Sequence, residues 1–330
     1  MSNLDFAVYG MKLQPGDIEG TFEFCQSESV VGVGWGLENK SYNSISEVKA
    51  THQDVVDERN AKGKKIERIN KDGRLYAPIR YMLKDIEKGD YVWVNEGNKF
   101  ALCKVQSDWN VTPNLDTEAA EQYSQYGIHH FRDVEWTDIS YSLVPGFIRR
   151  KFSRRYGTLK EMDDGINAKS KLVMEALHGK DESVSDSSLD RAAIANKIKN
   201  TDSEQVFDIL GPDETEDIVI SYLQSKGWRI IKSSTDSSQA KIECEMRREE
   251  NGESVLGYLQ VKTGSAGVDP TTYKEYAESG EMIFFVESGV DVEDYDDMSE
   301  IKSGTIHEYI INNYNYLPNE SMVKFDFMLD

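Results

Sequence analysis

The sequence predicts two domains of mixed α and β structure, a β-rich N-terminal domain followed by an α/β domain. A chain of 330 residues has, as a soft prior, about two domains. Residues 180–190 are rich in Ser and Asp and poor in apolar side chains, which indicates a linker or loop. After Gly211 and Pro212 the pattern changes to a helix followed by several strands. We therefore expect domains at 1–160 and 206–330, joined by a helical and polar linker at 161–205.

The N-terminal domain is expected to consist mostly of short strands. Phe22 and Phe24, and then residues 30–35, suggest strands that are punctuated by glycine. Residues 91–94 and 100–105 flank a polar turn that contains glycine, a pattern typical of a hairpin. The other expected elements are a charged segment with partly helical spacing at 46–74, an extended stretch at 131–142 and a helix at 145–163.

The C-terminal domain is expected to alternate helices and strands. Val219, Ile220 and Leu223 lie on one face of a helix at 213–226, and Gly227 is a typical residue to end it. The other expected elements are helices at 191–200, 271–279 and 306–314, strands at 228–231, 242–246, 255–262 and 282–286, and an acidic loop at 291–300.

Four polar side chains are expected to converge in this second domain. Glu216 lies on the apolar face of its helix, so it points toward the sheet. Gln260 and Lys262 alternate along one strand and therefore share a face. The polar turn at 247–254 joins this strand to the one that carries Glu243, so strand pairing brings Glu243 near both side chains.

These residue types suit metal-assisted hydrolysis. Mg²⁺ prefers oxygen ligands and keeps several waters. The carboxylates of Glu216 and Glu243, the amide of Gln260 and the backbone carbonyl of Val261 can supply such oxygens, with Mn²⁺ as a substitute ion. A bound metal lowers the pKa of its water and offsets the charge of a phosphate. Lys262 can orient or deprotonate that water, which makes it the fourth catalytic candidate.

The motifs around these residues resemble the PD-(D/E)xK nuclease superfamily, and most closely its restriction-endonuclease-like branch related to the Mrr type. The resemblance covers roughly residues 206–290 and implies metal-dependent phosphodiester hydrolysis on a mixed sheet flanked by helices. It assigns Glu216 as the helix acid, Glu243 as the central acid, and Gln260 with Lys262 as the strand motif. Asp is commoner at the position of Glu243, and an acid often stands where this chain has Gln260, which leaves one fewer negative charge on the metal.

Segments of the N-terminal domain resemble PUA/EVE-like β-barrels, which take a single, often modified, base into an aromatic pocket. The resemblance covers roughly residues 1–160, through motifs at 32–35, 86–94, 100–105 and 130–136. It implies a base-reading domain, and Trp35 and Trp109 are the candidate walls of its pocket, since a flipped base gains from stacking. The alternative is that both tryptophans belong to the barrel core.

A run of cationic side chains interleaved with aromatics comes next in the chain, and it is the strongest basic patch of the sequence. Its members are candidates for contact with DNA phosphates: Arg149, Arg150, Lys151, Arg154 and Arg155. A solvated helix face is the alternative interpretation. His129 and His130 suggest a metal site at first sight, but no second set of ligands has a suitable spacing, so we expect a structural role for them.

The net charge of −21 is divided unevenly along the chain. Residues 1–160 carry 22 Lys and Arg against 23 Asp and Glu, whereas residues 161–330 carry 16 against 36. Since the acidic half repels phosphate, affinity for DNA is expected to come from the first domain, from local patches or from a partner. The sequence has no apolar run of about 18 residues and no secretory signal at its start, so we expect no membrane span and a cytoplasmic protein. The three widely spaced cysteines are expected to be buried thiols.

Together these observations predict a Mg²⁺-dependent DNA endonuclease for modification-dependent restriction or phage defence. One alternative is a nucleic-acid-binding or sensing protein with an inactive nuclease fold, and a plain α/β domain with Glu243 on a solvated edge strand would belong with it. Another is a structure-specific DNA repair nuclease. A homodimer would supply the two active sites that cutting both strands requires.

Overall fold

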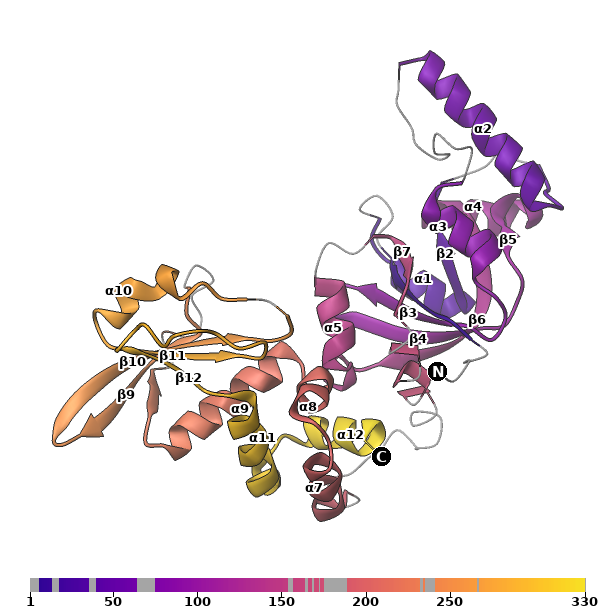
Figure 1. Ribbon diagram of the computed structural model, residues 1–330. Coiled ribbons are helices and arrows are strands. Elements are labelled where there is room, and N and C mark those ends of the chain that lie inside the picture. The colour runs from indigo at the N-terminus through magenta and orange to yellow at the C-terminus, as the bar shows by residue number, and fades with distance from the viewer. Residues whose placement is uncertain are drawn as a thin grey trace. The chain divides into compact units, whose positions relative to one another are not determined.

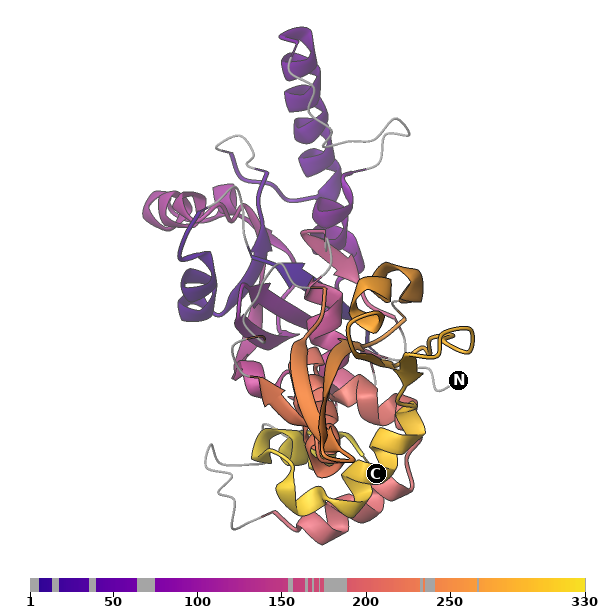
Figure 2. The ribbon, with the colours of Figure 1, turned by 90° about the vertical axis from the view of Figure 1, so that its left-hand side faces the viewer.

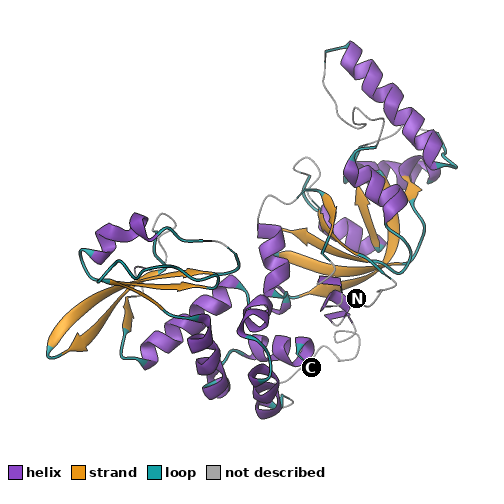
Figure 3. Ribbon diagram, in the orientation of Figure 1, coloured by secondary structure: helices purple, strands orange, loops and turns teal. Residues whose placement is uncertain are grey.

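The computed structural model describes residues 6–13, 18–35, 40–63, 75–153, 157–163, 166–167, 169–171, 173–174, 189–231, 234, 241–265 and 267–329. The chain divides into two compact units. Unit 1 consists of Met1–Val144 and Phe152–Lys180, and unit 2 consists of Pro145–Lys151 and Asp181–Asp330. Both units mix helices and strands (Figure 3), which is consistent with the expected two-domain fold of mixed α and β structure, and the domain boundaries at 160 and 206 stay predictions.

Unit 1 is built on a curled mixed sheet with the strand order β2-β6-β4-β3-β1-β7, in which β5 also pairs with β6. Among the described strands of this unit, β1 and β3 pair in parallel and the other pairs are antiparallel. The strands are β1 (Val8–Lys12), β2 (Val30–Val33), β3 (Tyr91–Glu96), β4 (Lys99–Val105), β5 (Asn110–Val111), β6 (His130–Ile139) and β7 (Leu159–Glu161). These pairings form an open path, so the closed barrel of the sequence analysis stays a prediction. The β3–β4 hairpin is confirmed, with Gly97 in the left-handed region at its turn.

Unit 1 also contains helices, and the long α2, the indigo helix at the top of Figures 1 and 2, extends away from this sheet. They are α1 (Thr21–Glu28), α2 (Ile45–Ala61), α3 (Ala77–Arg80) and α4 (Thr117–Gln125), with a π-helical turn at Tyr81–Asp85 and 3-10 turns at Thr112–Asn114 and Tyr141–Leu143. The strand prediction for Phe22 and Phe24 is wrong, because both lie in α1. Thr21, Phe22, Phe24 and Cys25 are all buried, a spacing that matches one helix face.

Unit 2 contains a five-stranded mixed sheet with the order β12-β11-β10-β9-β8. Its strands are β8 (Arg229–Ile231), β9 (Cys244–Glu250), β10 (Glu253–Lys262), β11 (Glu281–Val286) and β12 (Met298–Glu300). Its helices are α7 (Arg191–Lys199), α8 (Ser203–Ile209), α9 (Pro212–Ser225), α10 (Lys274–Ala277), α11 (Ser303–Asn312) and α12 (Asn319–Met328), with 3-10 turns at Pro270–Tyr273 and Tyr314–Tyr316. The predicted acidic loop at 291–300 is partly wrong, since its end forms β12.

The β9–β10 hairpin fixes which residues face each other in this sheet. Asn251 and Gly252 both have positive φ, at 52° and 86°, as the two central residues of a tight hairpin turn require. Because the turn sets the register, Glu253 pairs with Glu250 and the ladder runs on to Leu259 opposite Cys244. β11 and β12 then continue the sheet in parallel.

The two faces of this sheet are covered by different helices, with α10 on one side and α9 on the other (Figure 1). On the α10 side, Tyr258, Phe284 and Tyr273 belong to one buried apolar cluster. On the opposite side Phe285 contacts Phe207 of α8, with ring centroids 5.2 Å apart. Alternation along β10 and β11 therefore places Gln260 on the face with Phe284, and Val261 on the face with Phe285.

A buried charge cluster ties α5 (Gly146–Ser153) into unit 2. Glu214, in the first turn of α9, forms ion pairs with both Arg149 and Lys324. Their side chains are only 6% and 1% exposed, respectively. Ser321 donates a further hydrogen bond of 3.0 Å to Glu214. Burial, as the main cause, lowers the pKa of Lys324 to about 8. Glu214 is thus the carboxylate that compensates two buried cations within unit 2.

Among the helices that the structure describes, none combines the length and the apolar character needed to cross a membrane.

Candidate metal centre in unit 2

Glu216 lies one turn into α9, on the side of the helix that faces the sheet. The helix begins at Gly211 with Pro212 as its first residue, and Glu214 accepts a hydrogen bond of 2.7 Å from the Gly211 backbone nitrogen. Ile218, Val219 and Leu223 are buried, whereas Glu216 is half-buried.

Glu243 and Lys262 both influence the pKa of the Glu216 carboxyl. Burial is the main reason why the pKa of Glu216 rises to about 7, and the Glu243 carboxylate raises it further. Lys262 acts in the opposite direction. Burial also raises the pKa of the Cys244 thiol to about 12, and Glu216 and Glu243 both add to that effect. Glu216 on α9 is thus influenced by the charges of Glu243 and Lys262, and the meeting of Glu216 with them in one site stays a prediction.

Glu243, Gln260 and Lys262 meet where β9 begins. The backbone nitrogen of Glu243 donates to the Leu259 carbonyl at 2.8 Å, one residue out of the β9–β10 register, which holds Glu243 against β10 just before β9 begins. The Gln260 amide nitrogen donates to Glu243 Oε1 at 2.6 Å, and Lys262 Nζ lies 3.6 Å from that same oxygen. One carboxylate oxygen thus contacts both neighbours that strand alternation places beside it.

The backbone carbonyl of Val261 also points toward Glu243 and the Gln260 amide nitrogen. Carbonyls two residues apart along a strand point to the same side, so the Val261 carbonyl points like that of Leu259, toward β9. The chain at 241–243 forms a bend before β9 begins, and the ladder ends at Leu259 opposite Cys244. There the Val261 oxygen accepts a hydrogen bond of 3.0 Å from the Gln260 amide nitrogen. Glu243 Oε1 and the Val261 oxygen therefore share one donor.

Tyr273 is a member of this cluster that the sequence analysis missed. Its hydroxyl donates to Gln260 Oε1 at 3.2 Å, from the 3-10 turn that leads into α10. Tyr273 is buried, and Gln260 is only 2% exposed. The Gln260 amide is therefore held at both ends, by Glu243 and Val261 on one side and by Tyr273 on the other.

The donor set fits a hard divalent cation such as Mg²⁺, which takes carboxylate, amide and carbonyl oxygens. Within the described part of the chain, no group of three or more His, Cys, Asp or Glu side chains is arranged to hold a metal. A cation here would therefore rely on two carboxylates, Glu216 and Glu243, and on the neutral oxygens of Gln260 and Val261. Such a set is too poor in charge and in nitrogen or sulfur for a structural zinc site.

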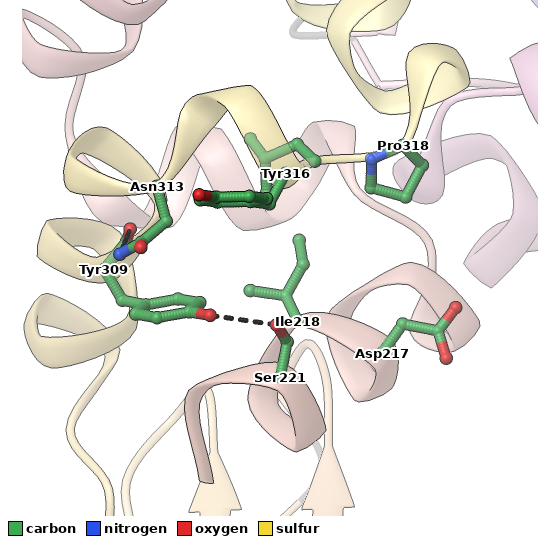
Figure 4. Close-up of a pocket in the computed structure, with 8 residues that line it drawn as sticks. Asp217, Ile218, Ser221, Tyr309, Asn313, Tyr316 and Pro318 are labelled. Atoms are coloured by element: carbon green, nitrogen blue, oxygen red, sulfur yellow. Dashed lines mark hydrogen bonds between the residues drawn. The ribbon is translucent and has the colours of Figure 1, made fainter. Parts of the chain in front are cut away.

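A small hollow of about 150 Å³ lies on the other side of α9 (Figure 4). Asp217, Ile218 and Ser221 line it from α9, and the Ser221 hydroxyl is 2.9 Å from the hydroxyl of Tyr309. These positions are on the opposite face of the helix from Glu216, by helical periodicity. Since Asp217 is the single carboxylate in its lining, the hollow lacks the paired acids that metal-assisted hydrolysis requires.

The basic run of the sequence is only partly described, and two of its members are engaged inside unit 2. Arg149 is buried in the Glu214 cluster and also lies 3.8 Å from Asp213. Arg150 pairs with Asp208 and donates to the Phe207 carbonyl at 3.2 Å. The expected phosphate contact at Arg149 is therefore corrected, because burial leaves its guanidinium almost no accessible surface. Lys151 is half-buried, and Arg154 and Arg155 lie outside the described residues.

Trp35 and Trp109 are both half-buried and pack against the core of unit 1. Trp35 has a φ of 70°, and its ring meets the exposed Tyr76 edge-on with centroids 5.2 Å apart. The structure thus gives each tryptophan both a packed side and an accessible side. His130 is buried with its Nε2 3.1 Å from Nε2 of His52, a partner that the sequence spacing did not indicate.

No protein-family model matches the sequence, and neither does any curated protein. Among solved structures the chain is similar to the MspJI restriction endonuclease in complex with a 27-mer oligonucleotide, with 10% sequence identity and a TM-score of 0.26. The alignment covers 76% of this chain and 68% of that chain. At so low a TM-score the likeness carries no argument about the function of this chain.

Proposed function

We propose that unit 2 is a Mg²⁺-dependent phosphodiesterase that cuts DNA, built as a restriction-endonuclease-like PD-(D/E)xK domain. The observation that carries the proposal is the meeting of Glu243, Gln260 and Lys262 around one carboxylate oxygen, within the electrostatic reach of Glu216. Glu243, Gln260 and Lys262 are in contact, and the fourth candidate, Glu216 on α9, has its pKa raised by Glu243 and lowered by Lys262.

Each residue has a role that its placement supports. Glu243 and Glu216 hold the cation, together with the oxygens of Val261 and Gln260. A bound Mg²⁺ supplies a more acidic water and offsets the charge that develops on the phosphate. Lys262, which is 43% exposed beside Glu243, would orient the attacking water and stabilise the phosphate in the transition state. The water oxygen would bond to phosphorus and lose its proton to solvent, while the bond to the deoxyribose oxygen breaks and that oxygen takes up a proton.

We further propose that unit 1 is the base-reading part, as a PUA/EVE-like domain with Trp35 in its pocket. A non-glycine residue with positive φ is uncommon, and such strained backbone clusters at functional sites. Trp35 holds a bulky ring in that conformation beside a second exposed aromatic, Tyr76. Reading a modified base and cutting nearby DNA is the activity of a modification-dependent restriction enzyme. A second copy of the chain would supply the active site for the second strand.

The experiment is a cleavage assay on duplexes of one sequence with cytosine, 5-methylcytosine or 5-hydroxymethylcytosine, or with N6-methyladenine. We expect cleavage in Mg²⁺ and none in EDTA, with one modified duplex cut about tenfold faster or more. Trp35→Ala removes this ratio because the base loses its stacking partner, which contributes about 1–3 kcal/mol. Trp136→Ala is the matched control, since Trp136 is also half-buried and packs on the same core.

The outcomes separate the proposal from its rivals. Equal rates on all duplexes would favour a structure-specific repair nuclease and would overturn the base-reading role of Trp35. DNA binding without cleavage of any duplex would favour a sensing protein with an inactive nuclease fold. One observation favours that second rival: Gln260 turns its amide nitrogen, rather than its oxygen, toward Glu243.

A further inference from the structure

The Gln260 side chain points its amide nitrogen, and not its oxygen, toward the other candidate metal ligands. Its amide nitrogen is 2.6 Å from Glu243 Oε1 and 3.0 Å from the Val261 oxygen, and its own oxygen faces Tyr273. An NH₂ group has two donors and no acceptor, so it cannot coordinate a cation. In this orientation the amide satisfies the two oxygens that a cation would otherwise satisfy.

The same side chain can present its oxygen without changing its volume. Rotation by about 180° about the last side-chain bond exchanges the nitrogen and oxygen of an amide, because the two atoms are nearly equal in size. After this rotation Gln260 Oε1 faces Glu243 Oε1 and the Val261 oxygen. Three acceptors that face one another, two of them buried and one partly buried, are unfavourable unless a cation lies among them.

Tyr273 is suited to both orientations. Its hydroxyl now donates to Gln260 Oε1, and a hydroxyl also has lone pairs that accept from an amide N–H. After the rotation Gln260 Nε2 would face the Tyr273 oxygen, which accepts. Both side chains are buried, so a residue without this double capacity would leave a buried polar atom unsatisfied in one orientation.

We propose that the Gln260 amide occupies the place of the cation in the cation-free protein and turns over when a divalent cation binds, with Tyr273 as the positioning residue that satisfies either orientation. The proposal rests on the proposed function, since it needs a cation at Glu243. It goes beyond that function by making Gln260 an internal substitute for the cation. Without a cation, the amide nitrogen satisfies the oxygens of Glu243 and Val261 by hydrogen bonds. A single side-chain rotation then makes these oxygens and that of Gln260 available to a cation.

The test monitors the side-chain amide of Gln260 by NMR in full-length protein labelled with ¹⁵N at glutamine side chains, titrated with Mg²⁺ alone. The two proton resonances of the Gln260 amide are assigned as those absent from the spectrum of Gln260→Glu. Gln260→Met serves the same purpose if Gln260→Glu does not fold. Without Mg²⁺ we expect slow exchange of these protons with water, because the amide is buried and both hydrogens are donated to oxygens of Glu243 and Val261. With Mg²⁺ the pair shifts, at a midpoint that matches the calorimetric binding curve. The exposed Gln224 in the same unit is the control and should not move.

Tyr273→Phe is expected to change the exchange rate of the Gln260 amide protons in the Mg²⁺-bound protein alone, a difference that a purely structural role of Tyr273 does not predict. In the cation-free variant the amide protons still bond to Glu243 and Val261, so their shifts and exchange rates stay those of the wild type. In the Mg²⁺-bound variant the same protons face a ring without an acceptor, so they exchange faster than in bound wild type.

The experiment distinguishes failure of the Gln260 rotation, failure of the Tyr273 role and failure of the proposed function. Calorimetric binding of Mg²⁺ with no movement of the Gln260 pair overturns the rotation and leaves the proposed function standing. Equal amide shifts and exchange rates for bound wild type and bound Tyr273→Phe overturn the role of Tyr273. No binding of Mg²⁺ at all overturns both the rotation and the proposed function.

Discussion

Lys262→Ala is expected to lower the rate of Mg²⁺-dependent DNA cleavage by about 10²–10⁴-fold, the usual contribution of a positioned proton-transfer or charge-stabilising group. The Lys262 ammonium is 3.6 Å from Glu243 Oε1 and is the cationic neighbour that opposes the rise in the pKa of Glu216. It is therefore placed next to the proposed cation and the water that attacks the phosphate. Single-turnover cleavage at saturating Mg²⁺ measures the loss.

Folding and DNA binding should survive this change. The side chain is 43% exposed, and an ion pair with that exposure contributes little to stability. Circular dichroism and fluorescence anisotropy in EDTA check both properties. Lys226→Ala is the matched control, an exposed lysine just after α9 that should cut at the wild-type rate. Wild-type cleavage by Lys262→Ala would remove this lysine from the chemistry.

Glu214→Ala is expected to lower the free energy of unfolding by about 3–5 kcal/mol, the typical cost of removing one partner from a buried ion pair. The carboxylate pairs with Arg149 and Lys324, two side chains with almost no exposed surface. Even with Glu214 present, burial lowers the pKa of Lys324 to about 8. Without it, two cations remain buried and face each other. Urea unfolding measures the loss.

The neighbouring acid provides the control for this prediction. Asp213 is 74% exposed and 3.8 Å from Arg149, so Asp213→Ala should change stability by no more than about 1 kcal/mol. Adding Lys324→Met to Glu214→Ala should restore part of the lost stability, because it removes one of the two buried cations that lost their ion pair with Glu214. Equal effects of Glu214→Ala and Asp213→Ala would show that the cluster does not stabilise unit 2.

The strand part of the candidate centre was predictable because it depends on local rules. The alternation along a strand places Gln260 and Lys262 on one face, and pairing of the two strands brings Glu243 near both. The turn is shorter than the expected 247–254, since β9 and β10 leave only Asn251 and Gly252 between them. The apolar spacing of α9 indicated that Glu216 lies toward the sheet, and its part in the site stays a prediction.

What escaped prediction depends on contacts between distant parts of the chain. Arg149 belongs to a basic run that suggests a solvated surface, yet its partner Glu214 stands 65 residues away and draws it into the interior. Tyr273 contacts Gln260 through the packing of a 3-10 turn on the sheet, and no periodicity of its own segment indicates that contact. Phe22 and Phe24 alternate like strand residues, but burial of Thr21 and Cys25 as well makes a helix face the better fit.

The most direct test of the central claim is the position of a cation in a crystal soaked with Mn²⁺, located by anomalous scattering. We predict one peak about 2 Å from a Glu243 carboxylate oxygen and from the Val261 carbonyl oxygen, with Glu216 in the same coordination sphere and Lys262 beside it. A soaked crystal with no peak there, and with Glu243 still bonded to the Gln260 amide nitrogen, would contradict a metal-dependent nuclease in unit 2.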